Sequence, residues 1–492
     1  MRPITVVCTY IAEPLFLPAL RNLARSDLVE EVLIVARDPI PDILPRCSII
    51  DKGPFASRET FQKILAQAQT DYLLFIPRSI PVVGPGTLER LIGAARSTGA
   101  ATVYSDFYDD TGHGTTLHPL IDYQPGSVRD DFNFGYLALL DVSVIRDALR
   151  KYGETPPVRH AALYDIRLKM SIDHGVHRIP EPLYNVVTHR ESHEREAHFA
   201  YVDPGNQPLQ KEMEAVFTEH LKRIGAYLPP QRLKKMDEPE EPFPVKASVV
   251  IPVKNRSKTI ADAVQSALTQ ETDFTFNVLV IDNHSTDGTT EIVADLASKN
   301  PAVKHIIPAG NDLGIGGCWN LGITDETCGR YAVQLDSDDL YENHLVLETI
   351  VDTLRDGSYA MVVGSYTIVN ERLEQIPPGL IDHREWTGEN GHNNALRVNG
   401  LGAPRAFSTT AIRGIGGFLN VSYGEDYAAA LRISREYRIG RIYESLYLCR
   451  RWSGNTDAAL SVEAANRNDA FKDSLRTTEI LERQGLTRRS GP

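Results

Sequence analysis

Short apolar runs rich in β-branched residues alternate with amphipathic segments in the second half of the chain. Strand-like runs occupy residues 247–253, 277–281 and 331–335. Residues 257–268 and 289–296 instead have the apolar spacing of helices, and Ser257 is the expected cap of the first helix. Strands and helices that alternate at these lengths predict parallel βαβ units with right-handed crossovers.

The first half of the chain repeats this order of elements. Residues 4–9, 32–35 and 72–76 are strand-like, and helical stretches separate them. Near the end of each half a similar hexapeptide occurs, Ile-Pro-Glu-Pro-Leu-Tyr at 179–184 and Ile-Tyr-Glu-Ser-Leu-Tyr at 442–447. We therefore predict an α/β chain that is a tandem of two related, Rossmann-like domains with mostly parallel sheets.

A linker separates the two halves. Residues 228–246 contain five prolines and a dense run of charges, which disrupt both helix and strand periodicity. Beyond residue 461 the apolar spacing is helical again, at Ala470, Phe471, Leu475, Ile480 and Leu481. The predicted domains are thus 1–227, a linker at 228–246, a second domain at 247–460, and a C-terminal helix and tail at 461–492.

Composition narrows the class of protein. At 492 residues the chain is long enough for two or three domains, and 42% hydrophobic with 24% charged residues is typical of a globular protein. A net charge of −13 argues against a nucleic-acid partner. No run approaches the roughly 18 apolar residues of a membrane span. Five scattered cysteines favour reduced thiols and a cytoplasmic location, and peripheral contact with the inner face of a membrane stays open.

An acidic cluster follows the strand at 331–335. Asp336, Asp338 and Asp339 crowd three carboxylates at the carboxyl end of a strand, the edge where open parallel sheets bind ligands. Such like charges repel unless a cation neutralises them, and oxygen ligands at this density suit Mg²⁺ or Mn²⁺. The alternative is a solvated turn in which an aspartate caps the next helix.

Two other polar segments follow strands or open helices. Asp282 and Asn283 end one strand, where an acid can accept hydrogen bonds from a nucleobase or ribose. Gly314 lies in a glycine-rich loop where backbone can approach a ligand. Either segment could also be a simple turn with capping residues.

These motifs together resemble glycosyltransferase family 2. The segments 249–256 and 280–289 are similar to the opening of that family, and the pattern continues through Asn311, Gly314 and Asn320. Leu-Asp-Ser-Asp-Asp at 335–339 resembles its DxD segment. Gly-Gly-Phe at 416–418 and Gly-Glu-Asp-Tyr at 424–427 resemble its acceptor-side motifs.

The resemblance implies a GT-A fold in the second domain and a GT-A-like first domain. It implies a nucleoside-diphosphate sugar donor, with a UDP-sugar favoured, and a Mn²⁺ or Mg²⁺ ion held by Asp338 and Asp336. Asp426 would be the base of an inverting transfer, with Glu425 orienting the acceptor or the base. The implied donor-binding residues are Pro252, Asn255, Arg256, Asp282, Asn283, Gly314, Asn320, Asp336, Arg451 and Trp452.

One departure from the family lies after the last strand. Family members often have a histidine there, whereas this chain has Arg451 and Trp452. An arginine fork can bind a diphosphate and an indole can stack on a sugar. The alternative for Trp452 is a core aromatic.

The first half lacks the acidic residues of the second. Its counterpart of the acidic strand end is Phe-Ile-Pro-Arg-Ser at 75–79, without a carboxylate. We therefore expect a non-catalytic first domain.

Two other functions stay open: a non-catalytic sugar-nucleotide or glycan-binding protein, and a sugar nucleotidyltransferase. Transfer in glycan or polysaccharide assembly to a carbohydrate or lipid-linked acceptor is the function that the resemblance implies. A homodimer stays open.

Overall fold

The computed structural model describes residues 2–489 except 41–43, 79–80, 111, 113, 188–206, 238–241, 385, 453 and 456–459. Part of the predicted linker and the last residues of the tail lie outside these. The described chain forms two compact units. The first contains the chain up to Tyr227 together with the segment from Leu460, and the second contains Leu228–Ala459.

The first unit is an α/β unit. Its strands are β1 (Ile4–Thr9), β2 (Val29–Val35), β3 (Cys47–Asp51), β4 (Tyr72–Ile76), β5 (Val82–Val83), β6 (Thr102–Asp110), β7 (Thr115–His118), β8 (Ala138–Asp141) and β9 (Val176–Val187). Its helices are α1 (Phe16–Arg25), α2 (Arg58–Gln67), α3 (Thr87–Thr98), α4 (Val142–Tyr152), α5 (Ala162–Asp173), α7 (Gln207–Arg223) and α15 (Val462–Arg489).

The second unit is also built from alternating strands and helices. Its strands are β10 (Ala247–Val253), β11 (Phe276–Asp282), β12 (Val303–Ile306), β13 (Tyr331–Gln334), β14 (Leu340–Tyr341), β15 (Met361–Val369), β16 (Gln375–Ile381), β17 (Arg405–Ser408) and β18 (Ile439–Arg450). Its helices are α8 (Ile260–Leu268), α9 (Thr289–Lys299), α10 (Ile315–Thr324), α11 (Val346–Asp356), α12 (Gly391–Asn394), α13 (Thr409–Gly414) and α14 (Glu425–Glu436).

The two sheets have the same topology. The first has the order β3-β2-β1-β4-β8-β6-β9-β5 with β7 on β6, and the second has β12-β11-β10-β13-β17-β15-β18-β14 with β16 on β15. In each, the first four strands are parallel and the fifth is antiparallel to its neighbours. The predicted tandem of related α/β units is confirmed, and the hexapeptides that suggested it lie in the matching long strands β9 and β18.

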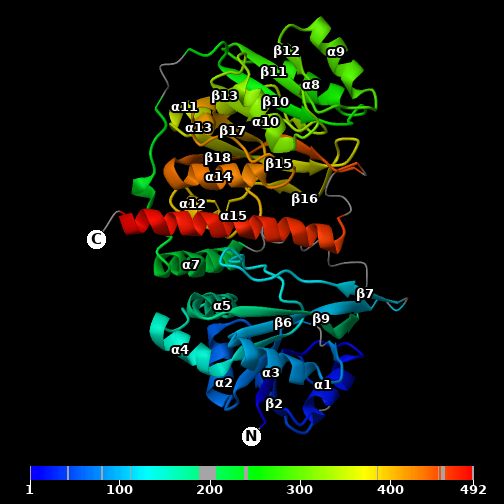
Figure 1. Ribbon diagram of the computed structural model, residues 1–492, viewed down its shortest axis with the longest axis vertical. Coiled ribbons are helices and arrows are strands. Elements are labelled where there is room, and N and C mark those ends of the chain that lie inside the picture. The colour runs from blue at the N-terminus through cyan, green and yellow to red at the C-terminus, as the bar shows by residue number, and fades with distance from the viewer. Residues whose placement is uncertain are drawn as a thin grey trace. The chain divides into compact units, whose positions relative to one another are not determined.

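Burial on both faces explains the continuous apolar strands. In β10, Val249, Val250 and Ile251 have no exposed surface, because helices such as α8 and α10 cover opposite faces of the second sheet (Figure 1). The expected cap of α8 is wrong by two residues. The cap position is Thr259, whose hydroxyl donates to the carbonyl of Ser337 at 2.9 Å, whereas the Ser257 amide donates to Asp287.

The C-terminal helix α15 packs on the first unit with a charged face. Figure 1 shows it beside α7, and Gln484 donates to the Ile224 carbonyl just beyond that helix. Of the apolar positions that predict the helix, only Ile480 is buried, while Leu481 is 58% exposed. The buried face instead carries Asp473 and Arg476, paired at 2.7 Å. This polar docking explains why apolar spacing could not predict the contact face.

A close approach of backbone fixes α15 at Gly126. The Gly126 amide donates to the Thr477 hydroxyl at 2.8 Å, and Ser127 donates to Asp473 at 2.7 Å. A Cβ on Gly126 would lie 2.0 Å from the Asp473 carbonyl oxygen. Only glycine therefore fits between the loop and the helix.

We predict that Gly126→Ala destabilises the protein by about 1–3 kcal/mol, because the helix must shift to admit the methyl group. Urea unfolding followed by circular dichroism measures the change. The matched control is Gly93→Ala in α3, where a Cβ meets no atom within 4 Å. Alanine there stabilises by about 0.5–1 kcal/mol. Equal stability of the Gly126 variant and wild type would contradict this docking.

Candidate active site

Polar loops collect at the carboxyl ends of the parallel strands of the second unit. The loop after β10 and the turn after β11 brace each other: the Asn255 side-chain oxygen accepts from the Thr286 amide at 2.8 Å, and the Arg256 amide donates to the Thr289 hydroxyl at 2.8 Å. Asn255 has a left-handed backbone, with φ 54°. Pro252, a few residues earlier, lies within β10 beside Ile281.

Asp282 organises the turn after β11. Its side chain has no exposed surface and accepts from the Ser285 amide at 3.0 Å and the Thr290 hydroxyl at 2.5 Å. Burial alone would raise the pKa of Asp282, but these hydrogen bonds outweigh it and hold the pKa below its usual value. Its neighbour Asn283 donates to the Leu313 carbonyl at 2.9 Å, and its buried side-chain oxygen has no hydrogen-bond partner among the described residues.

The acidic loop after β13 leads into a strand, β14, so the alternative of a helix cap is excluded for it. Asp336 accepts from the Gln334 amide group at 2.9 and 3.0 Å, and its own amide donates to the Tyr447 hydroxyl at 2.8 Å. Burial raises the pKa of Asp336, and the Arg405 guanidinium opposes that rise. Asp339 is buried and accepts from the Arg450 amide at 2.7 Å.

Asp338 has a different set of partners from Asp336 and Asp339. One of its oxygens, Oδ2, accepts from the Trp452 indole at 3.2 Å and the Asn455 amide group at 3.3 Å, and the Arg256 guanidinium lies 3.5 Å from it. The other oxygen, Oδ1, makes no hydrogen bond within the described part of the chain. Trp452 is half-buried rather than a core aromatic, and Arg256 lies 5.9 Å from its ring centre.

Asp426 and Glu425 begin helix α14. Arg405, at the start of β17, lies 2.9 Å from an Asp426 oxygen. Burial, with a smaller contribution from the nearby Asp426 charge, raises the pKa of Glu425 to about 8. Burial lowers the pKa of Arg405, but the charges of Asp426, Asp336 and Glu425 outweigh it and raise that pKa. Arg405 therefore links the acidic loop electrostatically to the start of α14.

Two predicted donor-binding residues hold loops in place. The Asn320 side chain donates to the Phe418 carbonyl and accepts from the Phe418 amide, both at 2.8 Å, so it clamps the Gly-Gly-Phe segment. The Gly314 amide donates to Asn420 at 2.7 Å, and a Cβ there would lie 2.5 Å from the Val421 carbonyl carbon. A third, Arg451, follows β18 directly, and its amide donates to the Val369 carbonyl at 2.8 Å.

The donor chemistry of Asp338 fits a divalent cation. Among the described residues, no group of three or more histidine, cysteine, aspartate or glutamate side chains is arranged to hold a metal ion. Mg²⁺ and Mn²⁺ sites often use one or two carboxylates and take the remaining oxygens from diphosphate and water. Asp338 suits such a site, because two hydrogen bonds and the Arg256 ion pair hold its Oδ2 while Oδ1 has no hydrogen bond among the described residues.

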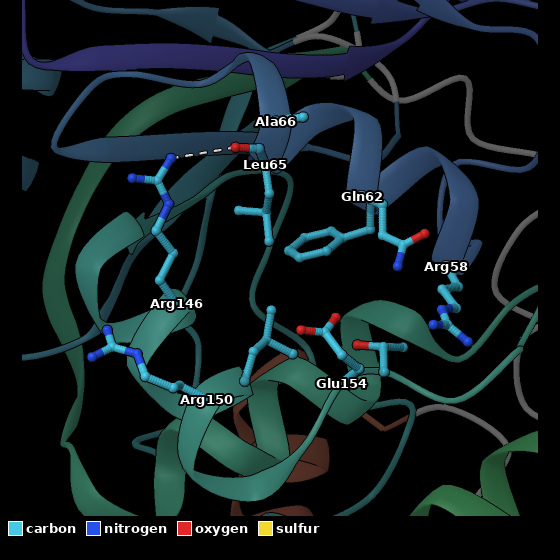
Figure 2. A pocket seen from close by; sticks show the side chains of 10 residues that line it. Arg58, Gln62, Leu65, Ala66, Arg146, Arg150 and Glu154 are labelled. Carbon is cyan, nitrogen blue, oxygen red and sulfur yellow. Dashed lines mark hydrogen bonds between the residues drawn. The ribbon is translucent and has the colours of Figure 1, made fainter.

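A cavity of about 420 Å³ lies elsewhere, between α2 and α4 of the first unit (Figure 2). Arg146 in its wall donates to the Leu65 and Ala68 carbonyls at the end of α2, and Arg150 pairs with Asp147. Arg146 therefore caps the end of α2, and Arg150 neutralises the Asp147 carboxylate. The cavity lies away from the strand ends and is no candidate for the active site.

A family model decides which class this site belongs to. The model of glycosyl transferase family 2 matches residues 248–411, which include the loops after β10, β11 and β13. The chain carries a glycosyltransferase family 2 domain. An uncharacterized glycosyltransferase of Rickettsia conorii is 29% identical over 216 residues, which are 43% of this chain and 34% of the relative. The chain thus spans about a third of that relative's length.

Solved structures resemble the chain in fold. Residues 1–349 of S. aureus TarS in complex with UDP-GlcNAc are 21% identical, covering 48% of this chain and 72% of that one, with a TM-score of 0.37. A mannosyltransferase of Pyrobaculum calidifontis in complex with GDP-Man and Mn²⁺ is 15% identical, covering 59% and 87%, with a TM-score of 0.35. Neither likeness bears on the substrate of this chain.

Several residues around the family 2 site were not among the predicted ones. Gln334, Arg405, Tyr447 and Asn455 hold Asp336, Asp426 or Asp338. Gln334 lies two residues before Asp336, the first residue of the acidic cluster, and Tyr447 ends the repeated hexapeptide, so both had a local signal. Arg405 had none, because only the antiparallel pairing of β17 with β13 brings it to this edge.

We predict that Glu425 makes the stability of the metal-free protein fall as pH rises from about 4.5 to about 8. Its folded pKa of about 8 exceeds the ordinary 4.5, so the native state holds the extra proton in that window and loses this stabilisation towards pH 8. Asp426, Arg405 and Asp336 are the charged groups that bear on it.

Glu425→Gln should therefore flatten this part of the stability profile, and urea unfolding at half-unit pH steps in chelator measures it. Glu371→Gln, at an exposed position, is the matched control. An unchanged slope in the Glu425 variant would contradict the raised pKa.

Proposed function

We propose that the second unit transfers a sugar from a nucleoside-diphosphate donor to an acceptor hydroxyl, with inversion at the anomeric carbon. The observation that supports this most strongly is that Arg405 interacts electrostatically with Asp336 of the acidic loop and with Glu425 and Asp426 at the start of α14, beside a region that matches family 2 over residues 248–411. Glycosyl transfer needs a cation that stabilises the departing diphosphate and a base that accepts the proton of the acceptor hydroxyl, and both must lie at the same edge of the sheet.

In this proposal, the loops after β10, β11 and β13 bind the donor. Asn283 offers an unpaired, buried oxygen to the nucleoside, while Asp282 fixes the turn that positions it. Asp338, with Asp336 behind it, would hold Mn²⁺ or Mg²⁺, which neutralises the charge on the departing diphosphate when bound. Arg256 and Arg451 provide further positive charge, and Trp452 offers a half-exposed indole to the sugar.

Asp426 is the proposed general base. It accepts the proton of the acceptor hydroxyl while a new bond forms from that oxygen to the anomeric carbon. The bond to the diphosphate oxygen breaks on the opposite face, and the nucleoside diphosphate leaves with the electron pair. Arg405, 2.9 Å from an Asp426 oxygen, forms an ion pair with this carboxylate. Glu425, with a pKa of about 8, is protonated there and can donate a hydrogen bond that orients the acceptor.

The remaining expectations belong to the same proposal. The catalytic domain is 247–460, the first domain (1–227) is non-catalytic, 228–246 is a linker and 461–492 completes the chain. None of the helices that the structure describes is long and apolar enough to cross a membrane. A cytoplasmic enzyme with a UDP-sugar donor and a carbohydrate or lipid-linked acceptor is the form we propose, supported by five free cysteines.

We predict donor-specific, Mn²⁺-dependent release of nucleotide when the full chain meets a panel of nucleoside-diphosphate sugars. Asp338→Asn and Asp426→Asn should each lower the rate at least about 100-fold, since each removes a group used in the transition state. Nucleotide release by a coupled assay measures this, and Asp295→Asn on the outer helix α9 is the control.

Release that persists in both variants would contradict the assigned roles. Pyrophosphate release from a sugar phosphate and a nucleoside triphosphate would instead identify a nucleotidyltransferase. Donor binding without any turnover, with or without hydroxyl acceptors, would favour a binding protein.

A further inference from the structure

The first unit has a second cavity, of about 260 Å³, at the carboxyl edge of its sheet. Its wall combines aromatic side chains, among them Phe132, Phe134 and Tyr164, with the ionisable side chains of Asp130, His160 and Arg167. Ligand sites commonly pair a mostly apolar wall with a few polar groups.

This cavity occupies the position that the active site has in the second unit. Because the two sheets share one strand order, β4 corresponds to β13, β8 to β17, and α5 to α14. Tyr72 pairs with Asp141 as Tyr331 pairs with Ser408. Counting along the strands from these pairs places Phe75 at the position of Gln334 and Pro77 at that of Asp336.

The other two matches follow in the same way. Ala138, the partner of Phe75, matches Arg405, and Leu163, the second residue of α5, matches Asp426. All four first-unit residues, Phe75, Pro77, Ala138 and Leu163, line the cavity. The polar side chains at these four positions of the second unit, Gln334, Asp336, Arg405 and Asp426, are thus replaced by apolar ones in the first.

The nearest acid on α5 does not restore the chemistry. Asp165 is buried and pairs with Lys169 at 2.6 Å, so it neutralises a core lysine. The carboxylate of the wall, Asp130, lies in the loop between β7 and β8, and no acid occupies the positions that match Asp336 and Asp338, so the cavity lacks the carboxylate pair proposed for the metal. A neutral ligand fits it better than a nucleotide.

The polar side chains in the cavity wall restrict the class of ligand further. Arg167 lies over the rings of Phe134 and Tyr164, with 5.6 and 4.9 Å to their centres. Its Nη2 donates to the Arg129 carbonyl, whereas its buried Nε has no hydrogen-bond partner among the described residues. The Arg167 side chain as a whole is half-buried and lines the cavity, and a guanidinium carries five N–H donors, so a ligand with acceptor oxygens suits this part of the wall.

We propose that this cavity is a saccharide-binding site that takes one neutral pyranose residue of a glycan. A pyranose offers apolar C–H faces to aromatic rings and hydroxyl groups to Asp130, His160 and Arg167. An isoprenoid chain would match the rings but leave these three ionisable groups facing hydrocarbon. The inference does not depend on catalysis in the second unit.

Saturation-transfer NMR on the full chain tests it. The probes are the methyl glycosides of glucose, galactose, mannose, N-acetylglucosamine and N-acetylgalactosamine. We expect at least one to receive saturation. Leu163→Trp fills the cavity, and Phe134→Ala removes a ring, so each should weaken that probe's binding at least about tenfold.

Leu149→Trp in the other cavity of the same unit is the matched control and should bind as wild type does. Asp338→Asn should also keep the signal, which separates this site from the proposed active site. Circular dichroism confirms that each variant is folded.

The absence of saturation transfer to every probe would overturn the proposal. So would a signal that survives in both folded cavity variants. Binding of farnesol, lost in Leu163→Trp while no glycoside binds, would replace the saccharide with a lipid.

Discussion

Three carboxylates can stay together beside β13 because hydrogen-bond donors and one guanidinium surround them. Gln334 holds both oxygens of Asp336, the Arg450 amide binds Asp339, and Arg405 supplies positive charge between Asp336 and Asp426. Burial still raises the pKa of Asp336 and of Asp339, so the donors and Arg405 offset this effect only in part. Arg405 forms an ion pair with Asp426, and Asp338 has an oxygen, Oδ1, without a hydrogen bond in the described part of the chain, to which a cation can bind.

The first unit has the same fold but lacks the interaction between an arginine and the acids at this edge of the sheet. Its sheet has the same strand order, but Ala138 stands where Arg405 does, and Phe75 and Pro77 replace Gln334 and Asp336. Because the first unit lacks both the arginine and the aspartate at these positions, neither charge is left buried without its partner, which would be strongly destabilising. At matching positions of the sheet edge, the second unit therefore carries charged and polar side chains, whereas the first carries apolar ones.

Sequence patterns could predict the architecture because apolar strand runs and the repeated hexapeptide report local burial. The bounds of β1, β4 and β10 agree with the structure to the residue. Pairing across distant strands has no such signal, so Arg405 was missed although it neighbours Asp336. The burial of Asp282, and the charged face of α15, also depend on tertiary partners that periodicity does not encode.

Calorimetric titration of UDP into the full chain, with and without Mn²⁺, tests most directly whether the acidic loop is a metal-dependent diphosphate site. GDP is titrated as a second probe, so that a site that prefers guanine to uracil is also detected. The account predicts binding that requires Mn²⁺ in the wild type and is lost in Asp338→Asn. Equal binding of either nucleotide without metal, or metal-dependent binding that survives in that variant, would contradict it.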